Sequence, residues 1–230
     1  ITRHCHPGGQ VMRVLASADV HGRLEVYEWL LTAARQHDVE AVVLAGDLLG
    51  CPDGFVTPED AQRHDPQQLT KLLESAGVPV LYIMGNDDLV ELDARSARVQ
   101  SIHSRRVALG PFGFLGYQYS LPFMGGIFEK SEAGIEIDLA SLARLVDPKT
   151  VVVSHSPALG ILDPGFGESH IGSGSLLRFL ESNPFLVHIH GHSHAGFGRC
   201  GKHFNVASAG QARAMIVDLE TLEHTVLGME

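Results

Sequence analysis

The sequence of 230 residues has few cysteines, no long apolar run and a shortage of positive charge. Its cysteines, Cys5, Cys51 and Cys200, are far apart and odd in number, which argues against a disulfide framework and favours a reducing, cytoplasmic location. No apolar run approaches the ~18–20 residues of a membrane span, so we expect no membrane partner. Acidic residues outnumber Lys and Arg by 27 to 17, and the net charge of −10 disfavours binding to long nucleic acid.

The composition is that of a globular protein, with 44% hydrophobic and 19% charged residues. Residues 12–230 contain no internal repeat, low-complexity tract or linker, which predicts one α/β domain with a sizeable core. Residues 1–11 are polar and without pattern, and we interpret them as an N-terminal extension or tag remnant outside the fold.

Apolar runs that end in polar turns recur along the chain, as expected for buried strands. They cover 13–22, 41–50, 79–88, 150–157 and 185–194. Helical patterns at 25–38 and 66–77 separate the first three runs, and this β-α-β-α-β order favours parallel strands. The remaining segments predict surface loops at 51–66 and 120–135, a hairpin at 105–123, helices at 136–146 and 174–183, and a closing meander at 202–210, 213–221 and 223–228.

The polar turns concentrate acids, amides and histidines where strands end. Each turn alone has an ordinary explanation as a turn signal, a helix cap or a packed histidine. Ligands of open α/β sheets bind beyond the carboxyl ends of strands, so the fold would gather these side chains at one edge. The set is Asp19, His21, Asp47, Asn86, His155, His192 and His194. Seven ligands are too many for one tetrahedral ion and fit two ions roughly 3.5–4 Å apart. The mixed donor set suits Mn, Fe, Zn, Co or Ni.

The order D-x-H, G-D, G-N-x-D, H and G-H-x-H resembles the calcineurin-like metallophosphoesterase superfamily from about Val14 to Ala209. The resemblance implies a four-layer α-β-β-α sandwich and two metal ions with a water or hydroxide between them as the nucleophile. The first ion would be held by Asp19, His21, Asp47 and His194. The second would be held by Asp47, Asn86, His155 and His192. Residues 170–194 resemble the bacterial and archaeal Icc-like phosphoesterases in particular.

The chain departs from the family at Asp87, where many members carry a histidine thought to protonate the leaving group. An aspartate beside two cations should be ionised with a lowered pKa, which makes it a poor acid. We therefore expect a phosphodiesterase that acts on small soluble esters. The alternatives are a phosphomonoesterase or pyrophosphatase with a substitute acid, and a non-catalytic scaffold. The sequence GDLLG at 46–50 lacks the extension typical of serine/threonine protein phosphatases.

Two further residues are candidates for the catalytic machinery beside Asp87. Asp88 matches the family's acidic position and is expected behind the ligands. His170 would face the substrate from the loop before the predicted helix at 174–183, whose N-terminus would itself favour phosphate. Ser173 either contacts the substrate or caps that helix.

Several aromatic and imidazole side chains leave two interpretations open. His188 and His190 either pack against the sheet or, for His190, orient a metal ligand. Tyr117, Tyr119 and Phe123 either stack on a nucleobase or belong to the core.

Overall fold

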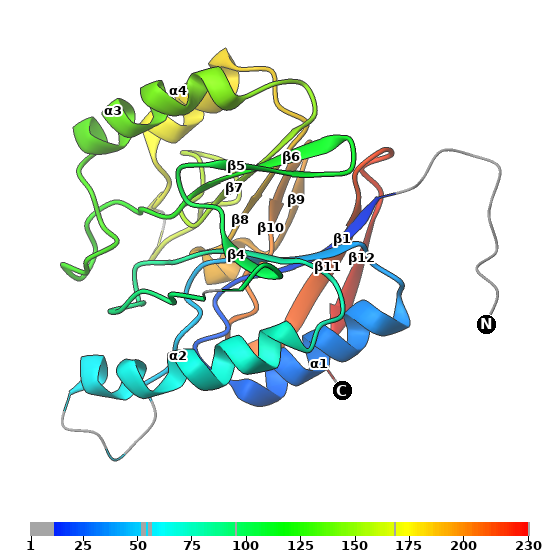
Figure 1. Ribbon diagram of the computed structural model, residues 1–230. Helices are drawn as coiled ribbons and strands as arrows, with labels where there is room; N and C mark the ends of the chain where they lie inside the picture. The colour runs from blue at the N-terminus through cyan, green and yellow to red at the C-terminus, as the bar shows by residue number, and fades with distance from the viewer. Residues whose placement is uncertain (1–11, 52–53, 55–56, 95, 168, 230) are drawn as a thin grey trace, which may run out of the picture.

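The computed structural model describes residues 12–51, 54, 57–94, 96–167 and 169–229, so the predicted extension at 1–11 lies outside the described residues. Two six-stranded sheets pack face to face, and helices cover the outer face of each (Figure 1). This arrangement confirms the predicted α-β-β-α sandwich. None of the helices in the described part of the chain combines the length and the apolar character that a membrane crossing needs.

The first sheet has the strand order β12-β11-β1-β2-β3-β4. Its strands are β1 (Arg13–Ser17), β2 (Ala41–Ala45), β3 (Val80–Ile83), β4 (Val99–Ser101), β11 (Arg213–Asp218) and β12 (His224–Gly228). β1 to β4 are parallel, whereas β11 and β12 are antiparallel to their neighbours. Helices α1 (Leu24–Gln36) and α2 (Pro58–Glu74) cover its outer face (Figure 1).

The second sheet has the order β5-β6-β7-β8-β10-β9. Its strands are β5 (Arg106–Leu109), β6 (Phe112–Tyr117), β7 (Thr150–Ser154), β8 (Val187–His190), β9 (Gly198–Cys200) and β10 (His203–Asn205). β6, β7, β8 and β10 are parallel, and β5 and β9 form antiparallel edges. Helices α3 (Glu132–Leu142) and α4 (Gly174–Ser182) and the 3-10 turn η1 (Ala143–Leu145) follow the hairpin and cover this sheet.

The middle core lies between the sheets, where alternate residues of the central strands meet. Val14 and Ala16 of β1 contribute to it from the first sheet, and Val187 and Ile189 of β8 contribute from the second. Successive side chains of a strand point to opposite faces, so His188 and His190 must lie on the outer face of β8.

The fold differs from the sequence prediction at α2 and in the closing meander. α2 begins at Pro58, inside the predicted loop 51–66, because Thr57 caps it by accepting the Asp60 N–H at 3.1 Å, and Pro66 lies within the helix. The predicted closing meander divides between the sheets: β10 pairs with β8 and β9, whereas β11 pairs with β1 and β12. Antiparallel pairing with β1 places β11 in the first sheet, and parallel pairing with β8 places β10 in the second.

Candidate metal centre

All seven predicted ligands lie beyond the carboxyl ends of parallel strands. Asp19 and His21 follow β1, Asp47 follows β2, Asn86 follows β3, His155 follows β7, and the remaining two histidines follow β8. Backbone hydrogen bonds join these turns directly. The N–H of Asp19 donates to Gly46 O at 2.9 Å, and the N–H of Gly191 donates to His155 O at 3.2 Å. The fold therefore gathers turns from both sheets at one edge.

Four of the predicted ligands have a left-handed backbone, which is unusual for residues other than glycine. The φ angles are 55° at Asp19, 51° at His21, 52° at Asp47 and 65° at His192. Such a conformation costs roughly 1–2 kcal/mol per residue and persists only where the surroundings enforce it. Strain of this kind concentrates at functional sites.

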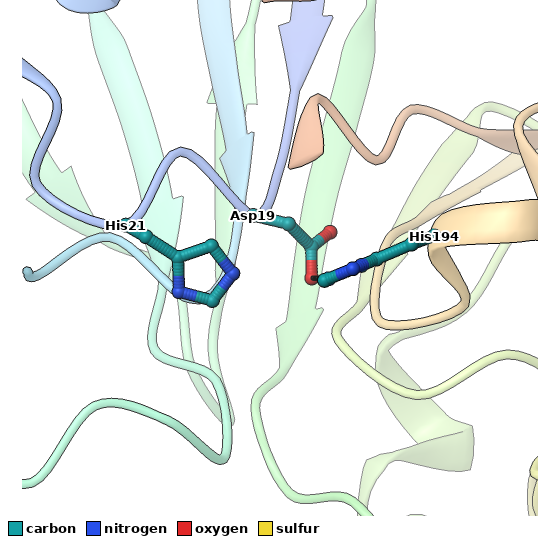
Figure 2. Close-up of side chains that lie close together, drawn as sticks. All are labelled: Asp19, His21 and His194. Carbon is teal, nitrogen blue, oxygen red and sulfur yellow. Dashed lines mark ion pairs between the residues drawn. The ribbon is translucent and has the colours of Figure 1, made fainter. Parts of the chain in front are cut away.

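Asp19 lies between His21 and His194 (Figure 2). Its Oδ1 is 3.3 Å from His194 Nε2, and the nearest ligand atoms of all three residues lie within 4.8 Å of one another. The backbone N–H of His192 donates to both Asp19 oxygens, at 3.2 and 3.0 Å. The buried carboxylate is thus held in place. Its hydrogen bond with the His194 ring raises the pKa of His194.

His155 faces Asp47 and Asn86 with a defined tautomer. Its Nδ1 lies 2.9 Å from Ala45 O, and because a carbonyl only accepts hydrogen bonds, Nδ1 carries a hydrogen. Its Nε2 lies 3.4 Å from Asp47 Oδ1 and 2.9 Å from Asn86 Oδ1. The Asn86 amide donates through Nδ2 to Asp87 Oδ1 at 2.7 Å, which orients Oδ1 towards His155.

Two acceptor oxygens therefore converge on His155 Nε2 in a fully buried position, and this geometry requires positive charge at that point. Burial is the largest single influence and would lower the pKa of His155, but the charge and hydrogen bond of Asp47, together with the Asp19 charge and the Ala45 carbonyl, outweigh it and raise the pKa to about 10. Burial likewise opposes ionisation of Asp47, but His155 lowers the Asp47 pKa below its usual range. A proton or a metal cation on Nε2 satisfies both oxygens, so the donor set fits a metal ion.

His192 completes this side of the cluster. Its ring centroid is 5.0 Å from that of His155, with an interplanar angle of 65°. Burial, reinforced by His155, lowers the pKa of His192 to about 4, so the imidazole is neutral at pH 7 and keeps a lone pair for a metal. Two further groups of nearby ligand atoms, Asp19 with Asp47 and His155, and His21 with Asp47 and Asp87, make the cluster continuous.

Glycines at the strand ends allow this close packing. A Cβ on Gly46 would collide with His155 Nδ1, and the glycine has a φ of +99°. A Cβ on Gly85 would collide with Asp47 Oδ1. The G-D and G-N motifs therefore need glycine because a side chain would displace the neighbouring ligands.

Asp88 lies behind the predicted ligands and is fully buried. Its Oδ1 accepts the N–H groups of Leu48 and Leu49 at 2.9 and 2.8 Å, and its Oδ2 accepts that of Gly85 at 2.8 Å. Burial and the charge of Asp47 raise the pKa of Asp88 to about 7, while the three N–H donors oppose that shift. Asp88 thus ties the turn that carries Asp47 to the turn after β3.

Asp87 lies at the solvent side of the cluster, with 40% of its side chain exposed. Its Oδ2 is 3.9 Å from His21 Nδ1, and its backbone N–H donates to Asp47 Oδ1 at 2.9 Å. In the protein itself, burial and the charge of Asp47 raise the pKa of Asp87. The lowering expected from the sequence requires the cations.

His170 pairs with Asp163, its Nδ1 lying 2.8 Å from Asp163 Oδ1, and its side chain is exposed. Asp163 is buried and also accepts the N–H groups of Gly160 and Gly172 at 3.0 and 3.1 Å. The sequence analysis did not identify Asp163, whose only local signal is an acidic residue between a leucine and a Pro-Gly turn. His170 shares no hydrogen bond with the predicted ligands among the described contacts.

The N-terminus of α4 is already occupied. Ser173 caps the helix by accepting the Leu176 N–H at 3.1 Å, as predicted for the cap, and it donates to Glu132 at 2.9 Å. The Glu132 carboxylate also accepts the Gly174 N–H at 2.6 Å. The predicted use of this helix end for phosphate was therefore wrong, because an internal carboxylate fills it.

His188 and His190 pack on the outer face of β8 and stack with ring centroids 4.9 Å apart. His188 Nε2 is 2.7 Å from Ser154 Oγ, and its Nδ1 is 3.1 Å from His203 Nδ1. His190 is fully buried, and its Nδ1 donates to Gly191 O at 3.3 Å. In these contacts both side chains pack against the sheet, and neither bonds to a predicted ligand side chain.

The three aromatic candidates differ in burial and in their contacts. Tyr117 is buried and donates to Asp138 at 3.0 Å, and Tyr119 packs against its neighbours with Lys130 Nζ 4.1 Å above its ring. Phe123 alone of the three is exposed.

Comparisons with known proteins show which structures share this fold. Among solved structures, the TT1561 protein of Thermus thermophilus superposes with a TM-score of 0.71 at 16% identity, over 95% of this chain and 99% of that one. A dimetal phosphatase from Danio rerio gives 0.62 at 14% identity, over 96% and 99%. An archaeal phosphodiesterase gives 0.51 at 14% identity, over 95% and 100%. These likenesses concern the fold.

No sequence among curated proteins matches this chain significantly. The family model described as calcineurin-like phosphoesterase matches residues 12–196, which include every predicted metal ligand. With the sandwich fold and a cluster of aspartates and histidines that fits a metal ion, this match shows that the chain belongs to the calcineurin-like phosphoesterase family.

Proposed function

We propose that this protein is a phosphodiesterase that uses two divalent transition-metal ions to hydrolyse small soluble esters. The observation that carries the proposal is the convergence of Asp47 Oδ1 and Asn86 Oδ1 on His155 Nε2 while Ala45 O fixes the other ring nitrogen. A neutral imidazole in that tautomer directs its lone pair at two oxygens, an arrangement that a cation stabilises. The donor set suits Mn, Fe, Zn, Co or Ni.

The chain would divide its ligands between two positions that share Asp47. Asp19, His21, Asp47 and His194 would hold one ion, and Asp47, Asn86, His155 and His192 would hold the other. Two divalent ions, when bound, supply Lewis acidity towards a water nucleophile and towards the phosphoryl oxygens. The hydrogen bonds from the His192 N–H to Asp19 and from His155 to Ala45 O keep these ligands oriented.

The preference for diesters rests on Asp87. No imidazole stands at this position to protonate a departing oxygen, and a carboxylate beside cations is a poor acid. Diesters with stable leaving groups need such a proton least. The cytoplasmic location, the small substrate and the exclusion of membranes and long nucleic acid stay predictions from composition.

One observation favours a second candidate, a phosphomonoesterase or pyrophosphatase with Asp87 as a substitute acid. Burial and the Asp47 charge raise the pKa of Asp87 in the protein itself. If that effect exceeded the influence of the ions, Asp87 would carry a proton within reach of the site, and monoesters would be good substrates.

Metal removal and reloading test both candidates. The protein is stripped with a chelator, reloaded separately with each of the five metals, and analysed for bound metal. The kcat/KM values for bis(p-nitrophenyl) phosphate and p-nitrophenyl phosphate are then compared. We expect two ions per chain and faster hydrolysis of the diester than of the monoester. His155→Gln should lose both properties. His64→Gln is the control and should retain them, because His64 is an exposed residue of α2.

Each outcome bears on a different part of the proposal. Faster monoester hydrolysis would favour the second candidate. Two bound ions with no hydrolysis of either ester would favour the scaffold alternative and contradict the enzyme assignment.

A further inference from the structure

The loop at 121–128, between β6 and α3, exposes three large apolar side chains. Phe123, Met124 and Ile127 are 60%, 74% and 60% exposed. The segment LPFMGGIF contains no charged or hydrogen-bonding side chain. Exposed apolar groups are ordinary when isolated, but three within five residues form a patch that indicates contact with an apolar ligand.

This loop borders the candidate metal centre at two points. The Phe123 ring centroid is 6.4 Å from that of His192, with an interplanar angle of 89°. Gly126 approaches Asn86 so closely that a Cβ would lie 2.7 Å from the Asn86 carbonyl oxygen. The apolar patch is therefore continuous with the Asn86 and His192 side of the cluster.

The loop has a defined conformation because Glu129 holds its backbone. The Glu129 carboxylate accepts the N–H groups of Phe123, Met124 and Gly125 at 2.9, 2.8 and 2.9 Å. Two backbone bonds close the base of the loop, from the Ser120 N–H to Phe128 O at 3.1 Å and from the Lys130 N–H to Ser120 O at 2.9 Å. These backbone donors are therefore engaged internally, and the apolar side chains are what the loop offers to a ligand.

We propose that Phe123, Met124 and Ile127 form the subsite for the organic group of the substrate, and that this group is aromatic. The inference rests on the proposed phosphoesterase function and specifies its substrate class. A sugar or a charged group would find no polar side chain on this loop, whereas an aromatic ring would bury its surface against Phe123. Preorganisation by Glu129 reduces the entropy lost on binding.

Two esters with the same leaving group test the subsite in the metal-loaded protein. They are phenyl p-nitrophenyl phosphate and methyl p-nitrophenyl phosphate, and the measurement is the ratio of their kcat/KM values. Intrinsic reactivity cancels when the ratio in a variant is divided by the ratio in the wild type. We expect Phe123→Ala to lower the ratio by about 3–10-fold, as for a lost aromatic pair. Phe123→Leu should lower it less.

Ile137→Ala is the matched control, since Ile137 is 72% exposed on α3. It should leave the ratio unchanged, and all variants should bind as much metal as the wild type. An unchanged ratio in Phe123→Ala, with hydrolysis intact, would overturn the subsite and leave the proposed function standing. An equal loss on both esters would assign the loop to the metal centre and overturn the subsite. A change in sedimentation without a change in the ratio would assign the loop to a protein contact, which also overturns the subsite. If the loaded wild type hydrolyses neither ester, the proposed function fails and the subsite fails with it.

Discussion

Replacement of Asp88 should weaken both the fold and the metal centre, although its described hydrogen bonds all go to backbone groups. Its carboxylate is fully buried and accepts three backbone N–H groups, those of Leu48, Leu49 and Gly85. The first two donors belong to the turn that carries Asp47, and Gly85 precedes Asn86. Asp88 therefore sets the spacing between two turns whose side chains meet at His155.

The magnitude follows from the number of donors. Asp88→Ala strands three buried N–H groups, each costing about 1–3 kcal/mol, so we expect a total loss of roughly 3–6 kcal/mol after partial relaxation. Asp88→Asn keeps one acceptor oxygen and places an amide N–H₂ against the remaining donor, so it should cost about 1–3 kcal/mol. Displaced turns should also lower metal affinity by about 10–100-fold.

Urea unfolding in chelator measures the stability, and titration of the refolded, metal-free variants measures the metal affinity. Glu74→Ala, at an exposed position at the end of α2, is the control and should stay within about 0.5 kcal/mol of the wild type. If Asp88→Ala lost less than about 1 kcal/mol and bound metal normally, that result would show that the three N–H contacts do not hold the two turns in place.

Four further predictions concern individual side chains. Asp47→Ala should lose metal from both positions, because no other side chain is proposed to serve both; two tightly bound ions in metal analysis would contradict the ligand assignment. His190→Ala should keep at least one-tenth of wild-type kcat/KM while His192→Ala does not, a threshold of ~1.4 kcal/mol in the barrier, and an equal collapse would show that His190 orients the site. Asp87→His should raise monoester relative to diester hydrolysis, since a well-placed acid supplies about 10²–10⁴-fold, and a constant ratio across matched aryl esters would count against Asp87 as the determinant. Burial, aided by Lys202, lowers the pKa of His203 to about 4, so folding excludes a proton that the unfolded chain binds below about pH 6.5. Stability should therefore fall as the pH drops from about 6.5 to 4, by less than about 1.4 kcal/mol per pH unit for this partly exposed ring. His203→Gln should flatten that slope in urea titrations, and an unchanged slope would place the effect elsewhere.

The sequence alone determined which residues meet at the candidate centre. Periodicity places the apolar runs on strands, and parallel strands bring their carboxyl ends to one edge, so the turns at Asp19, Asp47 and Asn86 had to be neighbours. The same logic placed His155 and His192 at that edge, and the structure adds that the strands before them, β7 and β8, belong to the second sheet. These inferences succeed because strand direction and turn position are local properties of the chain.

Longer-range packing decided what local patterns left open. The sequence pattern predicted a helix from residue 66, whereas α2 begins at Pro58, directly after the cap at Thr57. The sequence predicted β10 and β11 as strands of one closing meander, but partners elsewhere in the chain assign them to different sheets. The alternation along β8 predicts two faces, and only the packing of both sheets shows that His188 and His190 lie on the outer one.

The chemistry of the centre depends most on tertiary structure. The tautomer of His155 is set by Ala45 O, 110 residues away in the sequence. The contact of His155 Nε2 with Asn86 Oδ1 joins residues 69 positions apart. Glu132 fills the N-terminus of α4 from the preceding helix, which no motif announces. Residue types and spacing identify the groups that can bind a metal. The direction of each ligand's lone pair depends on contacts between distant segments. Those contacts exist only once both sheets have packed.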